Sequence, residues 1–223
     1  MRDVPALRRL EIEKWRTEGA TEDLLAERIR NTPGLSWGAF EQDGLARASC
    51  FIMGAQRADI LAARSWAEIT AQGTAATHDP RARFWFGISL SSEDARDLAA
   101  VLIEVSMAML RRGIRAVYLG SPLPGFRRWK VANPEGTVDA YVHGTLAGGS
   151  KYHADPALQY YLGLGFKIVQ TLPDYFPHEA SMNYGVVLRF DNRLWWLSRL
   201  FRLVGPKLFR RHAMRIVARW EPI

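Results

Sequence analysis

Residues 83–102 read RFWFGISLSSEDARDLAAVL, a run of aromatic and β-branched residues that leads directly into an amphipathic segment. The first part predicts a strand over 83–90, and the second predicts a helix over 92–112 with its apolar positions on one face. A helix that starts where a strand ends presents free backbone N–H groups, which is a favourable place for a phosphate. This turn, however, carries three acidic residues and no glycine. Serine and acidic residues also make a good helix cap, which explains the turn without any ligand.

The segments on either side of this stretch predict further strands and helices. Asp43-Gly44 lies between two strand-like runs and predicts a hairpin turn. Strands followed by a helix and then by strand, helix, strand and strand predict a mixed α/β layer fold. The stretch 120–150 contains several glycine and proline residues and is expected to be mostly irregular. The remaining expected elements are helices at 4–16, 22–30, 60–70 and 155–166, the hairpin at 35–54, and strands at 115–123, 167–173 and 182–190.

The positive charge of the chain is concentrated at its C-terminal end. Residues 193–223 hold eight of the 30 Lys and Arg and one of the 23 Asp and Glu, so this segment carries the net +7 and the preceding part is balanced. We therefore divide the chain into a body, 1–191, and a basic tail, 192–223. In the tail, Gly205-Pro206 separates two amphipathic helical patterns.

The tail predicts one of two modes of packing. Basic residues recur every four positions from Lys207 to Arg219, and Trp and Phe lie on another side, which is typical of a helix at an anionic membrane surface. We expect the segment 193–220 to make this contact. The alternative is that its apolar side packs against the body or against a second copy in a homodimer. A nucleic-acid partner is not expected, because no recognition motif accompanies the charge.

Cysteine, histidine and the N-terminal segment indicate the compartment of the protein and whether a metal site is expected. The single cysteine, Cys50, lies in an apolar run and is expected to be a buried structural residue. His143, His153, His178 and His212 lack the spacing of metal ligands, so no metal site is expected. The charged N-terminal segment resembles no secretory signal, and no apolar run is long enough to span a bilayer. We expect a cytoplasmic protein, or one attached peripherally to the inner face of the membrane.

Several motifs from residue 60 onward resemble the GNAT acyltransferase superfamily. The resemblance extends over about residues 3–190, is weak before residue 60, and is strongest to a subgroup of GNAT domains associated with carbon–nitrogen hydrolases. The matching motifs are W..IT..GT..TH.P at 66–80, GSPLPGF at 120–126, DPALQYYLGLGF at 155–166 and LPDYF…S.NYGVVLRF at 172–190. It implies a mostly antiparallel sheet flanked by helices, in which the strands 83–90 and 115–123 splay apart and hold an acyl thioester. We expect the first strand of that family to be missing, since the sequence starts almost at the first expected helix.

The resemblance also implies candidate site residues for transfer of an acyl group to an amine. Tyr161 occupies the place of the acid that protonates the departing thiolate, although a tyrosine on an amphipathic helix is also a common core residue. His78 is the best titratable candidate for the base, and it can equally be a loop histidine that bonds Thr74 or Thr77. The expected thioester-binding residues are Ile88, Ser89, Leu90, Ser91, Ser92, Arg96, Leu98 and Ala99, and the expected substrate-binding residues are Thr74, Thr77, Gly120, Ser121, Asp155 and Tyr160.

The turn at 91–99 departs from the family pattern for binding the diphosphate of coenzyme A. The glycine-rich pattern falls on Asp94, Asp97 and Ala99, of which only the last fits. Three explanations remain open. The diphosphate is displaced and held by Arg96, Arg127 or Arg128; the donor is an acyl carrier protein instead of acyl-CoA; or catalysis has been lost.

These observations lead to a functional prediction with one rival. The prediction is an N-acyltransferase that moves an acyl group from acyl-CoA or an acyl carrier protein to an amine of a lipid, amino acid or other small molecule at a membrane surface. The rival is a catalytically degenerate binding or scaffold protein with the same fold.

Overall fold

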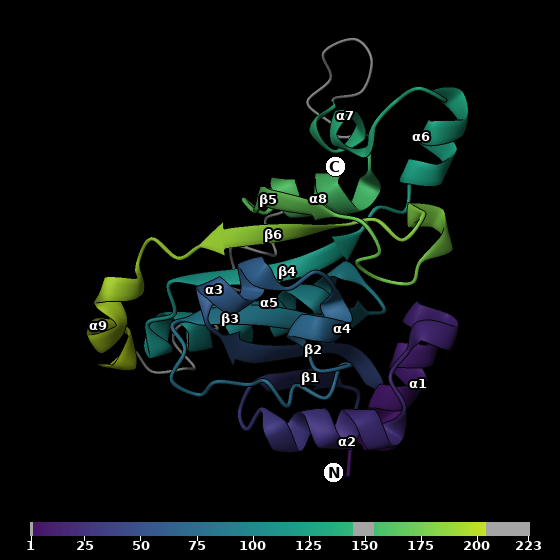
Figure 1. Cartoon of the computed structure of the whole chain (residues 1–223). Helices are drawn as coiled ribbons and strands as arrows, with labels where there is room; N and C mark the ends of the chain where they lie inside the picture. Colours follow the sequence, from purple (N-terminus) through teal and green to yellow (C-terminus); the bar gives the residue numbers. More distant parts are fainter. Residues whose placement is uncertain (1, 145–153, 204–223) are drawn as a thin grey trace.

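A six-stranded sheet forms the centre of the computed structural model, which describes residues 2–144 and 154–203 (Figure 1). The strand order is β1-β2-β3-β4-β6-β5, and β3 with β4 is a parallel pair while the other neighbours are antiparallel. The strands are β1 Ser36–Phe40, β2 Ala46–Ala55, β3 Phe84–Ser92, β4 Ala116–Pro122, β5 Lys167–Leu172 and β6 Gly185–Asp191. This mixed, mostly antiparallel α/β architecture confirms the predicted fold class.

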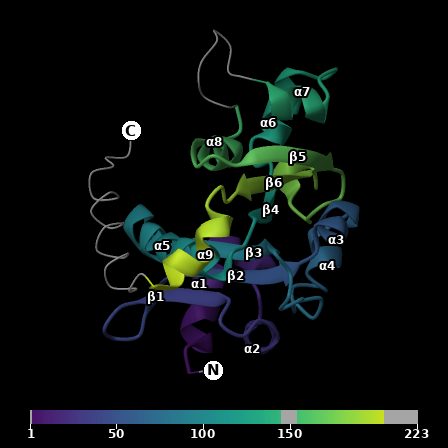
Figure 2. The same ribbon diagram turned by 90° about the vertical axis from the view of Figure 1, so that its left-hand side faces the viewer.

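Helices cover both faces of the sheet. The α-helices are α1 Val4–Trp15, α2 Glu22–Asn31, α3 Arg57–Ala62, α4 Trp66–Ile69, α5 Ala95–Arg112, α6 Phe126–Ala132, α7 Val138–His143, α8 Pro156–Gly163 and α9 Ser198–Leu203, with short 3₁₀ turns η1 Arg16–Glu18, η2 Glu179–Ser181 and η3 Trp195–Leu197. Helix α1 packs on one face of β2 and β3, and α5 packs on the other face of β1, β2 and β3. The turned view shows α9 beside α5, with α3 and α4 on the opposite side of the sheet (Figure 2).

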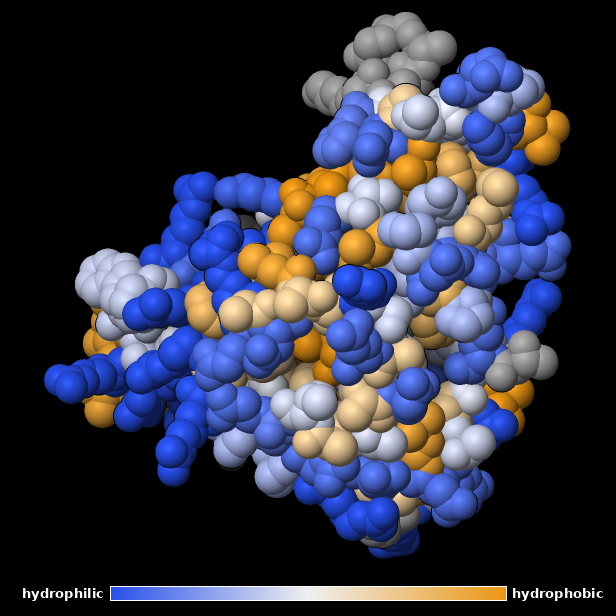
Figure 3. Space-filling model, viewed as in Figure 1, coloured by the Kyte–Doolittle hydropathy of each residue, from blue (hydrophilic) through white to orange (hydrophobic). Residues whose placement is uncertain are grey.

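Three apolar clusters hold these layers together. Phe51 and Phe86 are buried between the sheet and the α1 side, and Trp85 and Val101 are buried on the α5 side. A third cluster lies under α6, α7 and α8 and is centred on Phe126. Figure 3 shows hydrophobic residues gathered over the β5 and β6 part of the viewed face.

Three expected elements differ from the structure. The single helix expected at 60–70 is two helices, α3 and α4, because the segment between them is extended at Ala63 and Ser65. Residues 120–150 were expected to be mostly irregular, but α6 and α7 lie there, the second capped by Thr137. The last strand starts at Gly185 instead of 182, because residues just before it form the turn after η2.

The described part of the tail packs against the body. Arg115 places its guanidinium over the Trp195 ring at 4.7 Å, and Arg202 Nε donates to the Arg111 carbonyl at 3.2 Å. Trp196 and Leu203 remain 64% and 83% exposed. The second tail helix expected after Gly205-Pro206 lies outside the described residues. Within the described ranges, no helix combines the length and apolarity needed to cross a membrane.

Candidate functional site

Strands β3 and β4 separate halfway along their length. They pair in parallel only from Phe84 and Ala116 to Gly87 and Leu119. Beyond that point β3 remains paired with β2 up to Ser92, and β4 remains paired with β6 up to Pro122. The splayed strands predicted from the sequence are therefore confirmed, and we call this opening the fork.

A β-bulge in β3 lies at the base of the fork. The β2–β3 register steps from the pair Ile52–Gly87 to the pair Phe51–Ser89, so Ile88 is the extra residue. An extra residue shifts the alternation of side chains by one. As a result Ile88 belongs to the core on the α1 side, and Ser89 points to that side as well. The Ile88 carbonyl accepts a hydrogen bond from Trp66 Nε1 at 2.9 Å.

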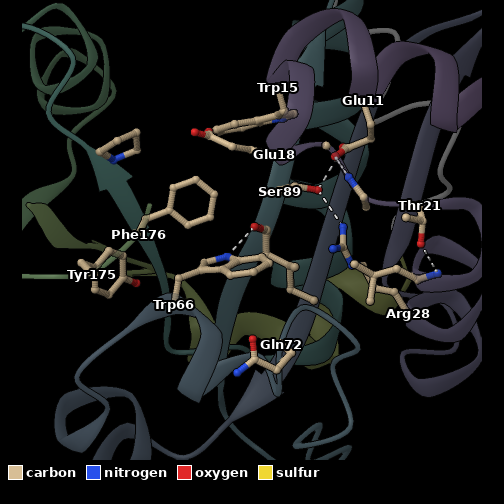
Figure 4. A pocket seen from close by; sticks show the side chains of 16 residues that line it. Glu11, Trp15, Glu18, Thr21, Arg28, Trp66, Gln72, Ser89, Tyr175 and Phe176 are labelled. Atoms are coloured by element: carbon tan, nitrogen blue, oxygen red, sulfur yellow. Dashed lines mark hydrogen bonds between the residues drawn. The ribbon is translucent and has the colours of Figure 1, made fainter. Parts of the chain in front are cut away.

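A pocket of about 750 Å³, open solvent included, lies on the α1 side of the fork (Figure 4). Its floor comes from β3 and β4, one wall from α1, η1 and α2, and the other from α4 and the β5–β6 loop. Trp15, Trp66 and Phe176 form an aromatic wall, in which the Phe176 ring meets the two indoles edge to face at 6.3 and 5.4 Å.

A polar network lies at the bottom of the pocket. Glu11 is 2% exposed, and its carboxylate accepts from Ser91 Oγ at 3.1 Å, Ser89 Oγ at 3.3 Å and the Ala20 amide at 3.4 Å. Arg28 is 1% exposed and donates from Nη1 to Ser89 Oγ at 3.1 Å. Ser89 thus links the buried Glu11 carboxylate to the buried Arg28 guanidinium, as the dashed lines in Figure 4 show.

Tyr175, in the loop between β5 and β6, lies at the fork itself. Its ring fits against Gly120 and Gly185, where an added Cβ would collide with ring atoms. Gly120 is the first β4 residue beyond the last β3–β4 pair. The loop is held in place because the Tyr175 carbonyl accepts from the Trp66 amide at 3.0 Å and its amide donates to the Asn183 carbonyl at 2.9 Å.

The Tyr175 hydroxyl is buried and has no hydrogen-bond partner within the described part of the chain. Burial raises its pKa above the ordinary value of 10.0, so the hydroxyl keeps its proton at neutral pH. A buried polar group without a partner is costly and needs an explanation. A ligand oxygen at the fork would provide the missing acceptor.

Tyr161 lies on α8, in the apolar cluster under α6, α7 and α8, and does not line this pocket. Its ring meets Phe166 edge to face at 5.6 Å. Burial, with smaller contributions from Tyr160 and Cys50, raises its pKa to about 12. Tyr161 is therefore protonated at neutral pH, and its role as the acid stays a prediction. Tyr160 is 41% exposed beside it.

The motif at 66–80 builds the pocket wall. Gly73 has φ of 83° and directs its carbonyl to Arg28 Nε at 2.8 Å, while its amide donates to Thr70 Oγ1 at 2.9 Å. Thr74 Oγ1 donates to the Ala71 carbonyl and Thr77 Oγ1 to the Ile69 carbonyl at the end of α4, both at 2.7 Å. The two threonine hydroxyls thus stabilise the loop, and neither residue lines the pocket. Their substrate-binding role stays a prediction.

His78 fastens the loop to the sheet. Its Nδ1 accepts from the Gly54 amide at 2.8 Å, and burial lowers its pKa below the ordinary 6.5. Gly54 pairs with Trp85, at the paired end of β3, and His78 is not a lining residue of the pocket. The structure does not bring it together with Gly120 and Ser89, which do line the pocket.

Asp155 and Ser121 are buried, and their side-chain oxygens form hydrogen bonds within the protein. Asp155 caps α8 by accepting from the Ala157 amide at 3.0 Å, and its other oxygen accepts from the Tyr141 hydroxyl at 2.8 Å and the Gly125 amide at 3.0 Å. Ser121 Oγ donates to the Pro122 carbonyl at 3.0 Å. Both predicted substrate-binding roles remain predictions.

The turn between β3 and α5 is occupied by its own side chains. Asp94 Oδ1 accepts from the amides of Arg96 and Asp97, both at 2.9 Å. Arg47 forms ion pairs with Asp94 and Asp97, both at 3.2 Å, and Lys14 pairs with Glu93 at 3.2 Å. These interactions lower the pKa of Asp94 and of Glu93, so both stay charged. The remaining residues predicted to bind the thioester here, Ser92, Arg96, Leu98 and Ala99, are exposed or half-buried around this capped turn.

Sequence reasoning missed the residues that define the pocket. Glu11 and Trp15 look like ordinary positions of an amphipathic helix, and Arg28 looks like a surface residue of the next one. Tyr175 and Phe176 were part of a matched motif, LPDYF, but received no role. Within the described residues, no group of His, Cys, Asp and Glu could hold a metal ion.

Comparison with known proteins gives structural matches. No protein-family model and no curated protein matches this chain. The GphF GNAT-like decarboxylase in complex with isobutyryl-CoA is similar at 25% identity and a TM-score of 0.69, over 85% of this chain and 95% of that chain. The loading GNATL domain of CurA from Lyngbya majuscula is similar at 16% identity and a TM-score of 0.67, over 85% and 92%. The aminoglycoside 6'-N-acetyltransferase from Enterococcus faecium is similar at 15% identity and a TM-score of 0.50, over 84% and 89%.

Proposed function

Because the chain is a member of the GNAT superfamily, we propose that it transfers an acyl group from a thioester at the fork to an amine in the adjoining pocket. The acceptor is an amine of a lipid, an amino acid or another small molecule. The observation that carries the proposal is the unpartnered Tyr175 hydroxyl at the point where β3 and β4 separate.

The fork supports thioester binding because it leaves strand edges without a neighbour. The β3 edge from Ile88 onward and the β4 edge from Gly120 onward no longer pair with each other. An extended pantetheine arm contains amide groups that can bond to such edges. Its thioester carbonyl would then lie where the Tyr175 hydroxyl can donate to it.

Tyr175 supports the chemistry as well as the binding. When an amine attacks a thioester, the carbonyl oxygen gains negative charge, and a preorganised donor stabilises that charge. The Tyr175 hydroxyl is protonated, buried and fixed by the backbone hydrogen bonds of its loop. It needs no reorganisation during the reaction.

The pocket offers a carboxylate for the incoming amine. Glu18 lines the pocket at its exposed rim and forms no ion pair among the described residues. An amine enters as a cation, which Glu18 and the faces of Trp15 and Trp66 attract. Loss of its proton to Glu18 would produce the neutral nucleophile.

We propose acyl-CoA as the donor to test first, since the similar decarboxylase structure contains isobutyryl-CoA. An acyl carrier protein is the alternative donor. The capped turn favours it, because Asp94 already occupies the amides of Arg96 and Asp97 that would otherwise receive a diphosphate. A carrier-bound pantetheine has only one phosphodiester to place.

Decarboxylation of a carboxylated acyl thioester is a second candidate function. The 25% identity to a GNAT-like decarboxylase favours it, and so does the buried Arg28 in the pocket. In that reaction the bond to the carboxylate breaks, CO₂ leaves, and the electron pair moves into the thioester carbonyl until a proton returns to carbon. The Tyr175 hydroxyl would stabilise the same oxygen.

A peripheral membrane position remains part of the proposal. Trp196, Leu200 and Leu203 are exposed on the packed tail segment, next to Arg199 and Arg202. Apolar side chains among arginines suit an anionic lipid surface. Flotation with vesicles of anionic lipid should recover the full chain and lose a variant that ends at residue 192; equal recovery of both would contradict docking.

The enzymatic proposal is tested by release of free thiol from acyl-CoA or acyl carrier protein in the presence of candidate amines. Tyr175→Phe should lower kcat about 100-fold, the usual loss when one oxyanion donor is removed. Tyr118→Phe is the matched control, because the Tyr118 hydroxyl is also buried without a partner but does not line the pocket. Thioester binding without release of thiol or CO₂ would instead support a scaffold protein.

A further inference from the structure

Arg28 is a buried cation whose hydrogen-bonding capacity is only partly used. Its Nε donates to the Gly73 carbonyl and its Nη1 to Ser89 Oγ, both neutral acceptors. A guanidinium carries five N–H donors. Nη2, which lies near Gly73, forms no hydrogen bond with the described residues.

The nearest acid does not neutralise Arg28 directly. Among the described residues, no carboxylate forms an ion pair with this guanidinium. Ser89 is the hydrogen-bonded link between Glu11 and Arg28, and the Glu11 oxygens already accept from Ser89, Ser91 and the Ala20 amide. Burial lowers the pKa of Arg28 to about 10 despite the attraction of Glu11, and the group remains charged at neutral pH.

A buried charge without a direct counter-ion is unfavourable. A ligand that supplies the opposite charge would offset this unfavourable free energy. Arg28 is placed to meet such a ligand, because it lines the pocket (Figure 4). Two parallel N–H groups of a guanidinium match the two oxygens of a carboxylate. The Phe51 ring, 5.1 Å from the guanidinium carbon, helps to hold the group in place.

We propose that Arg28 binds a carboxylate group of the substrate that occupies the pocket. This inference rests on the proposed function, since it specifies the substrate class of the same site. The carboxylate belongs either to the acyl group of the donor or to the amine acceptor. In both cases it lies beside Ser89, on the β3 side of the fork, while the reacting carbonyl faces Tyr175.

The wild-type protein tests the proposal without any substitution. In the donor arm, calorimetry compares succinyl-CoA with butyryl-CoA, which has a methyl group in place of the carboxylate. In the acceptor arm, it compares phenylalanine with 2-phenylethylamine, whose rings suit the aromatic wall. We expect the carboxylated ligand to bind about 10- to 100-fold more tightly in one arm, the usual worth of charge-assisted hydrogen bonds. The arm that shows the preference identifies the source of the carboxylate.

Two arginine variants connect the preference to the residue. Arg28→Met keeps the length of the side chain and removes its charge, and it should abolish the preference. Arg112→Met is the matched control, because Arg112 also lies over an aromatic ring and donates to a carbonyl but does not line the pocket. If Arg28→Met fails to fold, Ser89→Ala removes the partner of Nη1 and should reduce the preference several-fold.

Equal affinity for the paired ligands in both arms would overturn the proposal, and so would a preference that persists in Arg28→Met. These outcomes are separate from the proposed reaction. Binding is measured without turnover, so an absence of thiol release would remove the acyl-transfer function and leave the carboxylate preference measurable. Release of CO₂ from malonyl-CoA would place the carboxylate on the donor.

Discussion

The fork and the turn between β3 and α5 follow one another along the chain, but they differ in whether their polar groups have partners. At the fork, within the part of the chain that the structure describes, the Tyr175 hydroxyl has no hydrogen-bond partner and Arg28 has no ion pair with a carboxylate. At the turn before α5, Asp94 occupies the first helix amides, and Arg47 pairs with the acids. This contrast favours the fork over the turn as the place where a ligand binds, because the turn amides already have acceptors.

The same contrast applies to the two ends of a coenzyme A molecule, the thioester end and the diphosphate end. The fork suits a thioester carbonyl, which needs one hydrogen-bond donor. At the turn, the charged Asp94 carboxylate already accepts from the amides of Arg96 and Asp97, the groups that would otherwise receive the diphosphate. Binding energy for the donor is therefore expected to come from the pantetheine end more than from the diphosphate end.

The largest effect is expected from closing the fork with Gly120→Ala. An added Cβ would collide with the Tyr175 ring and hydroxyl, so the ring would have to move from its place at the fork. We expect turnover to fall more than 100-fold and stability to fall by about 1–3 kcal/mol, the usual cost of overpacking. Thiol release and thermal unfolding measure the two effects.

Gly163→Ala is the control for this substitution. A Cβ at Gly163 would meet nothing within 4 Å, and the residue lies at the end of α8. The same chemical change should leave turnover unchanged and stabilise the protein by up to about 1 kcal/mol. Normal turnover in Gly120→Ala would show that the thioester lies elsewhere.

A smaller effect is expected from opening the turn with Asp94→Gly. The substitution frees the amides of Arg96 and Asp97 and removes a negative charge, while glycine remains an acceptable cap. We expect coenzyme A to bind about 3- to 10-fold more tightly, with a stability loss of only a few tenths of a kcal/mol. Calorimetry with coenzyme A measures the affinity.

Pantetheine, which lacks the diphosphate, is the matched ligand for this experiment. Its affinity should be the same for the wild type and for Asp94→Gly. Thr137→Gly weakens the cap of α7, away from the pocket, and controls for general loosening of a helix start. Unchanged coenzyme A affinity in Asp94→Gly would mean that the diphosphate never approaches this turn.

The turn could be predicted from the sequence and the pocket at the fork could not, for a physical reason. The strand, the capped turn and the helix at 83–112 are local, so periodicity and capping residues predicted them. The fork was predicted through resemblance. Glu11, Arg28 and Tyr175 come from three segments far apart in the sequence, and only packing brings them to one pocket. Likewise, α6 and α7 were missed because Gly and Pro around 120–150 mark turns between short helices as readily as irregular chain.

A substitution of His78 tests whether the end of β3 that is paired with β4 takes part in the reaction at the fork. It lies near Gly54 and Trp85, about 10 Å along the strand from Ile88 at the strand rise of 3.3 Å per residue. His78→Asn keeps an acceptor for the Gly54 amide, and we expect turnover within about twofold of the wild type. A fall of tenfold or more would establish His78 as the base and break the division between the two ends.

The smallest effect is the contribution of His78 to stability. Burial lowers its pKa below 6.5, so the folded state favours the neutral ring. Its contribution is complete above pH 6.5 and is lost as the pH falls from 6.5 through the lower pKa of the folded state, because in this range the unfolded chain binds the proton more readily. Wild-type stability should therefore decrease from pH 7 to pH 5 more than that of His78→Asn, as measured by denaturant unfolding. His78→Ala should lose about 1 kcal/mol at pH 8, because the Gly54 amide then lacks its acceptor; parallel pH curves for all three proteins would show that the ring does not titrate with folding.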